Sequence, residues 1–213
     1  MSSIIDRISE LGIVPVVVID DPADAPALAG ALREGGLPIA EFTFRTDAAV
    51  AAIRIAAAAC PDVLVGAGSV LLPGQVDAAV EAGARFIVSP GIDDDVVLRA
   101  LGHGVASLPG CATPSDLMRA RRLGLDCVKF FPAEAAGGIE MLKAIAAPFP
   151  GLRFVPTGGI DLDNMAVYLS DSRVVAVGGS WMVKPALVRA HDWAAVSASA
   201  REAVAAVRRL REG

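Results

Sequence analysis

The stretch Val105–Pro132, VASLPGCATPSDLMRARRLGLDCVKFFP, contains one complete strand–helix–strand unit. Its two apolar ends, 105–108 and 126–130, predict strands, and the segment between them predicts a helix. Thr113 begins that helix with a capping hydroxyl, since a proline follows it directly and an acid stands three residues after it. Gly124 suits the end of the helix, where a left-handed residue turns the chain into the next strand. The stretch therefore predicts a β/α unit.

The same unit recurs along the chain, with helical segments between predicted strands at 13–19, 39–44, 63–67, 86–89, 105–108, 126–130, 153–156 and 174–177. Thr46 is expected to cap the helix that ends near Ala59. Eight such units predict a single-domain (β/α)8 TIM barrel over residues 1–213, with an extra N-terminal helix and a C-terminal helix. An open doubly wound sheet is the alternative, but its nucleotide loop would be Gly66–Leu71, which lacks the third glycine of that motif.

Composition and charge exclude several classes of protein. The 213 residues are 54% hydrophobic and 20% charged, which excludes intrinsic disorder. The mean hydropathy is +0.55, but no apolar run approaches the ~20 residues of a membrane-spanning helix. The net charge of −5 argues against a nucleic-acid partner. The three cysteines lack metal-ligand spacing, and the N-terminus does not resemble a signal peptide, so we expect reduced thiols, no metal and a cytoplasmic location.

Polar side chains occupy one face of the predicted strand 39–44. Side chains alternate along a strand, so Glu41, Thr43 and Arg45 share a face opposite Phe42. Such a face belongs either to a solvated edge strand or to a strand that lines an active site. A closed barrel has no edge strand, and the count of eight units therefore favours the active site.

Lys129 is the one lysine of three that lies inside an apolar strand. It is either a structural residue, paired with an acid or reaching out to solvent, or a desolvated amine with a lowered pKa that attacks a carbonyl. On inward faces of one barrel, Lys129 and Glu41 would supply a nucleophile and an acid/base.

Glycine pairs follow the last two predicted strands, at Gly158-Gly159 and Gly178-Gly179. They are either ordinary turns or loops whose backbone N–H groups approach an anion closely. Barrels of this kind commonly bind phosphate after strands seven and eight, which favours the second interpretation. A serine hydrolase is not supported, because there is no GxSxG motif and neither histidine ends a strand.

Six segments in this order resemble the 2-keto-3-deoxy-6-phosphogluconate aldolase family, and the resemblance spans nearly the whole chain. The segments are EFTFRT at 41–46, GAGSV at 66–70, SPG at 89–91, VKFFPAE at 128–134, PTGGI at 156–160 and GGSW at 178–181. The family consists of class I aldolases, which are lyases that form a Schiff base on a (β/α)8 barrel. They are usually trimeric and use no metal.

The resemblance implies a role for each matching residue. Lys129 would form the imine and Glu41 would be the general acid/base, while Arg45 would hold the carboxylate of the pyruvate portion. Ser69 and Thr157 would assist, and Ser69 stands where the family commonly has threonine, so that a hydroxyl is kept and a methyl is lost. The phosphate-binding residues would be Gly158, Gly159, Gly179 and Ser180.

The implied reaction is cleavage of 2-keto-3-deoxy-6-phosphogluconate to pyruvate and glyceraldehyde 3-phosphate in the Entner–Doudoroff pathway, by a homotrimer without a cofactor. Four alternatives stay open. In the first, the substrate is the C4-epimeric galactonate compound, and in the second, 4-hydroxy-2-oxoglutarate is also cleaved. In the third, the barrel is an isomerase or epimerase that uses Glu41 as a base without an imine. In the fourth, the protein is a non-catalytic binder of sugar phosphates or pyruvate.

Overall fold

Eight parallel strands form one sheet in the computed structural model, which describes residues 3–212; residues 1, 2 and 213 of the predicted domain lie outside it. The strands are β1 Ile13–Val17, β2 Ile39–Thr43, β3 Leu64–Gly68, β4 Phe86–Ser89, β5 Ala106–Cys111, β6 Cys127–Phe130, β7 Arg153–Pro156 and β8 Val177–Gly179. They pair in the order β7-β6-β5-β4-β3-β2-β1-β8. Isolated bridges from Phe154 to Val174 and from Thr157 to Gly178 join the two ends of this order. The predicted (β/α)8 barrel is confirmed.

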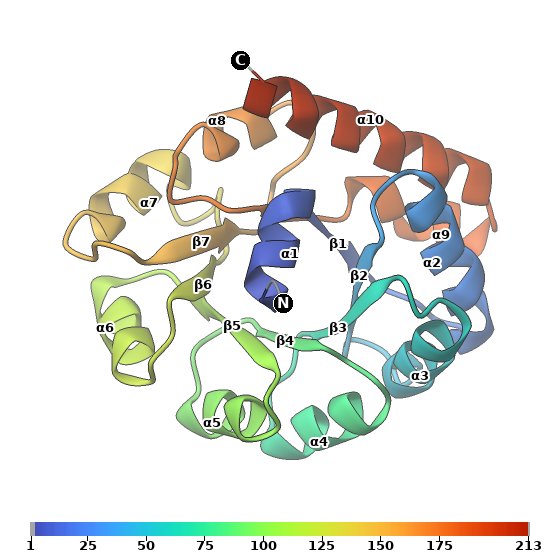
Figure 1. Cartoon of the computed structure of the whole chain (residues 1–213), viewed down its shortest axis with the longest axis horizontal. Coiled ribbons are helices and arrows are strands. Elements are labelled where there is room, and N and C mark those ends of the chain that lie inside the picture. Colours follow the sequence, from blue (N-terminus) through green and yellow to red (C-terminus); the bar gives the residue numbers. More distant parts are fainter. Residues whose placement is uncertain (1–2, 213) are drawn as a thin grey trace.

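Helices α2 to α10 surround the strands as an outer ring, and α1 lies over the middle of the barrel (Figure 1). The helices are α1 Ile4–Leu11, α2 Ala25–Glu34, α3 Ala49–Ala59, α4 Pro73–Glu81, α5 Asp94–Gly102, α6 Pro114–Arg122, α7 Gly138–Ala146, α8 Met165–Leu169, α9 Pro185–Arg189 and α10 Trp193–Glu212, with short 3₁₀ turns at Pro22–Asp24 and Trp181–Val183. The α6 start is as expected, since the Thr113 side chain accepts from the Asp116 N–H and Asp116 from that of Thr113. Gly124 has φ 79°, the left-handed conformation expected there.

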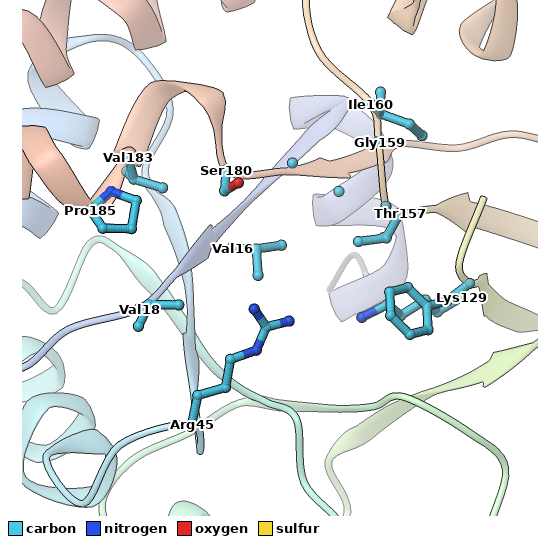
Figure 2. A pocket seen from close by; sticks show the side chains of 14 residues that line it. Val16, Val18, Arg45, Lys129, Thr157, Gly159, Ile160, Ser180, Val183 and Pro185 are labelled. Carbon is cyan, nitrogen blue, oxygen red and sulfur yellow. The ribbon is translucent and has the colours of Figure 1, made fainter. Parts of the chain in front are cut away.

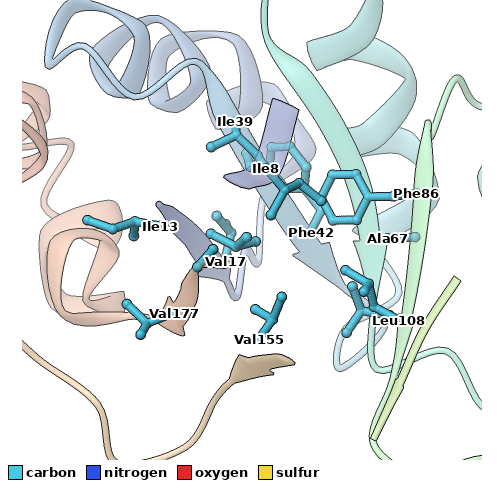
Figure 3. Close-up of a cluster of buried hydrophobic side chains, with 14 of the residues drawn as sticks. Ile8, Ile13, Val17, Ile39, Phe42, Ala67, Phe86, Leu108, Val155 and Val177 are labelled. Carbon is cyan, nitrogen blue, oxygen red and sulfur yellow. The ribbon is translucent and has the colours of Figure 1, made fainter. Parts of the chain in front are cut away.

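The extra N-terminal and C-terminal helices are both present. Helix α1 directly precedes β1 and lies across the barrel in Figure 1, while α10 runs along its outer rim. Ile8 of α1 is completely buried in the core formed by the strands (Figure 3). Helix α1 therefore closes the end of the barrel at which the strands begin, and the opposite end is left for a site.

Two local predictions were wrong. The predicted strand at 174–177 lies at Val177–Gly179 instead, because the two glycines pair with Val14 and Pro15 of β1 despite their low strand propensity. Thr46 does not cap α3, which begins at Ala49 without a side-chain cap. Its hydroxyl donates instead to the Ile19 carbonyl oxygen at 2.6 Å, tying the loop after β2 to the loop after β1.

Candidate active site

A cavity of about 270 Å³ opens at the end of the barrel where the strands finish. Polar and glycine residues from four of the strands or the segments after them meet there (Figure 2). The lining residues are Val16, Val18, Arg45, Lys129, Phe131, Thr157, Gly158, Gly159, Ile160, Gly178, Gly179, Ser180, Val183 and Pro185. This mouth is the end of the barrel that carries the active site in enzymes with this fold.

Lys129 on β6 brings an amine to the cavity while its side chain stays largely out of water. The residue is 6% exposed, and its Nζ lies 4.6 Å from the centroid of the Phe131 ring. Burial lowers the pKa of Lys129; the carboxyl group of Glu41 opposes this shift, and the charge of Arg45 adds to it. A lowered pKa increases the fraction of neutral amine, which is the form that attacks a carbonyl carbon.

Glu41 on β2 is 3% exposed, and its carboxyl group lies near enough to the Lys129 amine for the two charges to interact across the barrel interior. Burial raises the pKa of Glu41, and the charges of Lys129 and Arg45 oppose that shift. Within residues 3–212, its buried Oε1 has no hydrogen-bond partner. Leaving such an atom unpaired costs free energy, and exceptions of this kind call for a functional explanation. The environment therefore keeps a carboxyl group able to exchange a proton near the amine.

The Glu41 carboxyl group depends on a glycine in the neighbouring strand. Gly68 on β3 pairs with Thr43 in the sheet, and any Cβ added to Gly68 would overlap the Glu41 carboxyl group. The absence of a side chain at Gly68 thus creates the space that the catalytic candidate occupies.

Arg45 follows the end of β2 and extends its guanidinium group toward the same space as the Lys129 side chain (Figure 2). Its Nε donates to the Ser69 Oγ at 3.3 Å. Ser69 has φ 55°, an uncommon left-handed conformation for a residue with a side chain. The pair provides a cationic group oriented by a hydroxyl, which suits recognition of a carboxylate.

The segments after β7 and β8 form the other wall of the cavity. Gly158 and Gly159 have φ values of 105° and 79°, which residues with a side chain rarely adopt. In the described part of the chain, neither the Gly159 N–H nor the Ser180 hydroxyl has a hydrogen-bond partner. Arg45 and Lys129 are the only charged residues among those that line the cavity. An anion at this wall would therefore be bound by backbone N–H groups and a hydroxyl.

The structure brings all of the sequence-predicted site residues to this end of the barrel. Those that line the cavity are Arg45, Lys129, Thr157, Gly158, Gly159, Gly179 and Ser180. Glu41 lies beside Lys129, and Ser69 contacts Arg45. Sequence reasoning missed Phe131, although its position two residues after Lys129 could have indicated a shared face. It also missed the apolar wall that includes Val16 and Val18, which nothing in the strand pattern distinguishes from core.

The described residues include no group of three or more His, Cys, Asp or Glu side chains arranged to hold a metal ion. None of the helices in residues 3–212 has both the length and the apolarity needed to cross a membrane. The site's own groups are a buried amine, a carboxyl group, a guanidinium group and a loop with free N–H and hydroxyl donors. This set can form an imine with a keto acid and bind an anion at the glycine segments after β7 and β8.

Comparisons of this chain with a family model, with known sequences and with solved structures all point to the same family. The family model described as "Aldolase: KDPG and KHG aldolase" matches residues 4–199. A relative from Treponema pallidum named 2-dehydro-3-deoxy-phosphogluconate aldolase is 45% identical over 202 residues, covering 95% of this chain and 96% of the relative.

Two crystal structures resemble this barrel closely. A KDPG aldolase from Legionella pneumophila, with pyruvate captured as a covalent carbinolamine intermediate, has a TM-score of 0.90 and 39% identity, covering 94% of this chain and 98% of that one. The Zymomonas mobilis aldolase with 3-phosphoglycerate has a TM-score of 0.87 and 44% identity, covering 95% of each chain.

Proposed function

The chain belongs to the KDPG and KHG aldolase family, and on that premise we propose that it is a class I aldehyde-lyase that cleaves 2-keto-3-deoxy-6-phosphogluconate to pyruvate and glyceraldehyde 3-phosphate. The observation that carries the proposal is the buried Lys129 amine beside the Glu41 carboxyl group. This reaction also accounts for the wall of glycines opposite, because the substrate has a phosphate at the end remote from its ketone.

Imine formation begins at the neutral Lys129 amine. Its nitrogen attacks the C2 ketone and gives a carbinolamine, and loss of water then leaves a protonated imine at Nζ. Glu41 delivers the proton that departs with the hydroxyl group. The covalent pyruvate intermediate in the Legionella relative supports this step. Arg45 holds the C1 carboxylate, oriented by its contact with Ser69, and Thr157 assists at the same end.

Carbon–carbon cleavage uses the protonated imine as an electron sink. The Glu41 carboxylate removes the C4 hydroxyl proton, the C3–C4 bond breaks, and its electron pair moves into an enamine on Lys129. Glyceraldehyde 3-phosphate leaves. The enamine is protonated at C3 and the resulting pyruvate imine is hydrolysed, which regenerates the amine. Burial raises the pKa of Glu41, which favours the steps in which its carboxyl group delivers a proton, and lowers the pKa of Lys129, which favours the neutral amine that begins the next turnover.

The phosphate group is assigned to the Gly158, Gly159, Gly179 and Ser180 wall. The Zymomonas relative was crystallised with 3-phosphoglycerate, a three-carbon phosphate of similar size to the aldehyde product. The contribution of backbone donors rather than cations fits a site that releases a phosphorylated product in each turnover.

Substrate preference is tested by an assay that couples pyruvate release to a dehydrogenase. We expect release from 2-keto-3-deoxy-6-phosphogluconate to be faster than from its C4 epimer, the galactonate compound, because the named relatives act on the former. We also propose activity on 4-hydroxy-2-oxoglutarate, the second aldol substrate in the family's description. Equal or faster release from the galactonate epimer would overturn the preference, and no release from any of these substrates would overturn the aldolase proposal.

A homotrimer is proposed by resemblance to the family. Leu71 and Leu72, which follow β3 near the cavity mouth, are 59% and 62% exposed, and an interface would cover such side chains. Sedimentation equilibrium should give three times the 21.8 kDa chain mass. A single-chain mass at micromolar concentration would contradict the proposal, and Leu72→Glu should shift the equilibrium toward the single chain.

A further inference from the structure

The segment that follows β6 holds the Gly158–Gly159 loop from the side that faces away from the cavity. After β6, the chain runs alongside the loop after β7. The Ala133 N–H donates to the Thr157 carbonyl oxygen at 2.8 Å, and the Glu134 N–H donates to that of Gly158 at 3.0 Å. These bonds couple the reactive end of the site to the loop that faces the phosphate.

Glu134 is anchored in turn by the only tyrosine of the chain. The hydroxyl group of Tyr168 on α8 donates to the Glu134 Oε1. Tyr168 is 1% exposed, and burial together with this hydrogen bond raises its pKa. The Glu134 side chain crosses directly behind Gly159, where an added Cβ would lie 2.7 Å from Glu134 Cγ. The loop therefore has a side chain packed against its outer surface, and the hydrogen bond from Tyr168 restricts the movement of that side chain.

A second side chain of the same segment holds Gly159 by its carbonyl group. Asn164 Nδ2 donates to the Gly159 carbonyl oxygen at 2.8 Å, and Asn164 Oδ1 accepts from the Asp161 N–H at 3.0 Å. This bond holds the Gly159–Ile160 peptide, and the Glu134 N–H bond to the Gly158 carbonyl oxygen holds the Gly158–Gly159 peptide, which carries the Gly159 N–H. The peptides on both sides of Gly159 are therefore held by their carbonyl groups. We call Glu134, Asn164 and Tyr168 the loop clamp.

We propose that the loop clamp positions the Gly158–Gly159 loop for the substrate phosphate and thereby determines the preference for phosphorylated over unphosphorylated substrates. The inference rests on the proposed function, which places the phosphate at this loop. No residue of the clamp lines the cavity, so all three are positioning residues. Their effect follows from preorganisation, because N–H groups stabilise an anion strongly only when they already point at it. The two cations that line the cavity, Arg45 and Lys129, are assigned to the keto-acid end of the substrate and not to this loop.

The test compares two substrates that differ only in the phosphate, 2-keto-3-deoxy-6-phosphogluconate and 2-keto-3-deoxygluconate. Tyr168→Phe removes the hydroxyl and keeps the ring, and Asn164→Ala removes the second contact independently. For each variant we expect kcat/KM for the phosphorylated substrate to fall about tenfold, mainly through KM, as for loss of a hydrogen bond to a charged group or of a positioned loop. The value for the unphosphorylated substrate should stay within about twofold of the wild type, since it makes no phosphate contact.

Two further variants separate positioning from general stability. Glu134→Gln keeps an oxygen that accepts from Tyr168 and should retain the preference, whereas Glu134→Ala should lose it. Ser170→Ala is the matched control, because the Ser170 hydroxyl bonds only within its own segment, to the Val167 carbonyl oxygen at 2.8 Å. It should leave both substrates unaffected.

The proposal is overturned if folded Tyr168→Phe and Asn164→Ala proteins lose the same factor for both substrates, or lose thermal stability with the preference intact. If one variant fails to fold, the other decides. Failure of the underlying function is separately visible in the wild type: an enzyme that cleaves both substrates equally well has no phosphate site at this loop, and the clamp then has no such role.

Discussion

Replacing Lys129 by arginine is expected to reduce kcat/KM for 2-keto-3-deoxy-6-phosphogluconate by about 10⁴-fold or more, which corresponds to at least about 5.4 kcal/mol of lost transition-state stabilisation. The reason is chemical. A guanidinium group stays protonated at every pH that the protein tolerates, so it has no lone pair with which to attack the ketone. The cation itself is retained beside Glu41, and the loss therefore reports imine formation rather than charge.

Borohydride reduction in the presence of pyruvate gives the matching structural readout. In the wild type, mass spectrometry should find one pyruvyl unit per chain, and peptide mapping should place it on Lys129. Lys143→Arg is the matched control, because Lys143 is an exposed helical lysine paired with Glu140 at 3.2 Å; it should be labelled and active like the wild type. Lys129→Met provides a second test should the arginine side chain not fit the buried position.

Labelling of Lys143 or Lys184 would contradict the assignment of Lys129. So would a folded Lys129→Met protein that keeps its turnover, because that result would leave an isomerase-like barrel that acts through Glu41 without an imine.

Replacing Glu41 by glutamine should lower kcat by about 10²-fold or more, the effect typical of losing a general acid–base. The amide keeps the size of the side chain in the space left by Gly68, so substrate binding and the fold should be largely preserved. Steady-state kinetics measures the effect, and Glu140→Gln, which alters an exposed carboxylate, is the control.

The same variant makes a directional prediction for pH. The ionised Glu41 carboxylate raises the pKa of Lys129 against the lowering effect of burial. Removing that charge should lower the pKa of Lys129 further, so the acid limb of pyruvate-imine formation should move to lower pH. That limb marks the loss of neutral amine as the pH falls. Normal turnover with an unshifted limb would instead make Glu41 a structural partner of buried cations.

Several features of this protein could be predicted from sequence because they depend on neighbouring residues. The alternation of apolar runs with capped helices predicted the barrel, and the start of α6 at Thr113 illustrates how local that information is. The polar face of β2 and the single lysine in an apolar strand predicted Glu41 and Lys129, since a charged residue in a buried strand is costly without a purpose. The strand pattern offered a nucleophile and an acid/base as one interpretation of this pair, and the resemblance to a family selected that interpretation and implied the roles of Arg45, Ser69 and Thr157.

Other features were decided by contacts between segments far apart in the chain. The glycines of β8 became strand residues because β1 pairs with them, and Thr46 bonds the loop after β1 rather than the helix it precedes. In each case the local preference of the sequence is worth a fraction of a kilocalorie to about one kilocalorie per mole. Hydrogen bonds that form only once the barrel closes outweigh it.

Three further features also depend on contacts between segments far apart in the chain. They are the pKa shifts of Lys129 and Glu41, the space for the Glu41 carboxyl group, and the loop clamp. Burial of Lys129 and Glu41 exists only when β2 and β6 face one interior, and Tyr168 meets Glu134 across 34 residues of chain. The sequence by itself thus determined which chemical groups the protein has and which strands carry them. The tertiary structure alone decided the direction of their pKa shifts and their spacing, because desolvation and hydrogen bonding between distant segments are properties of the closed barrel.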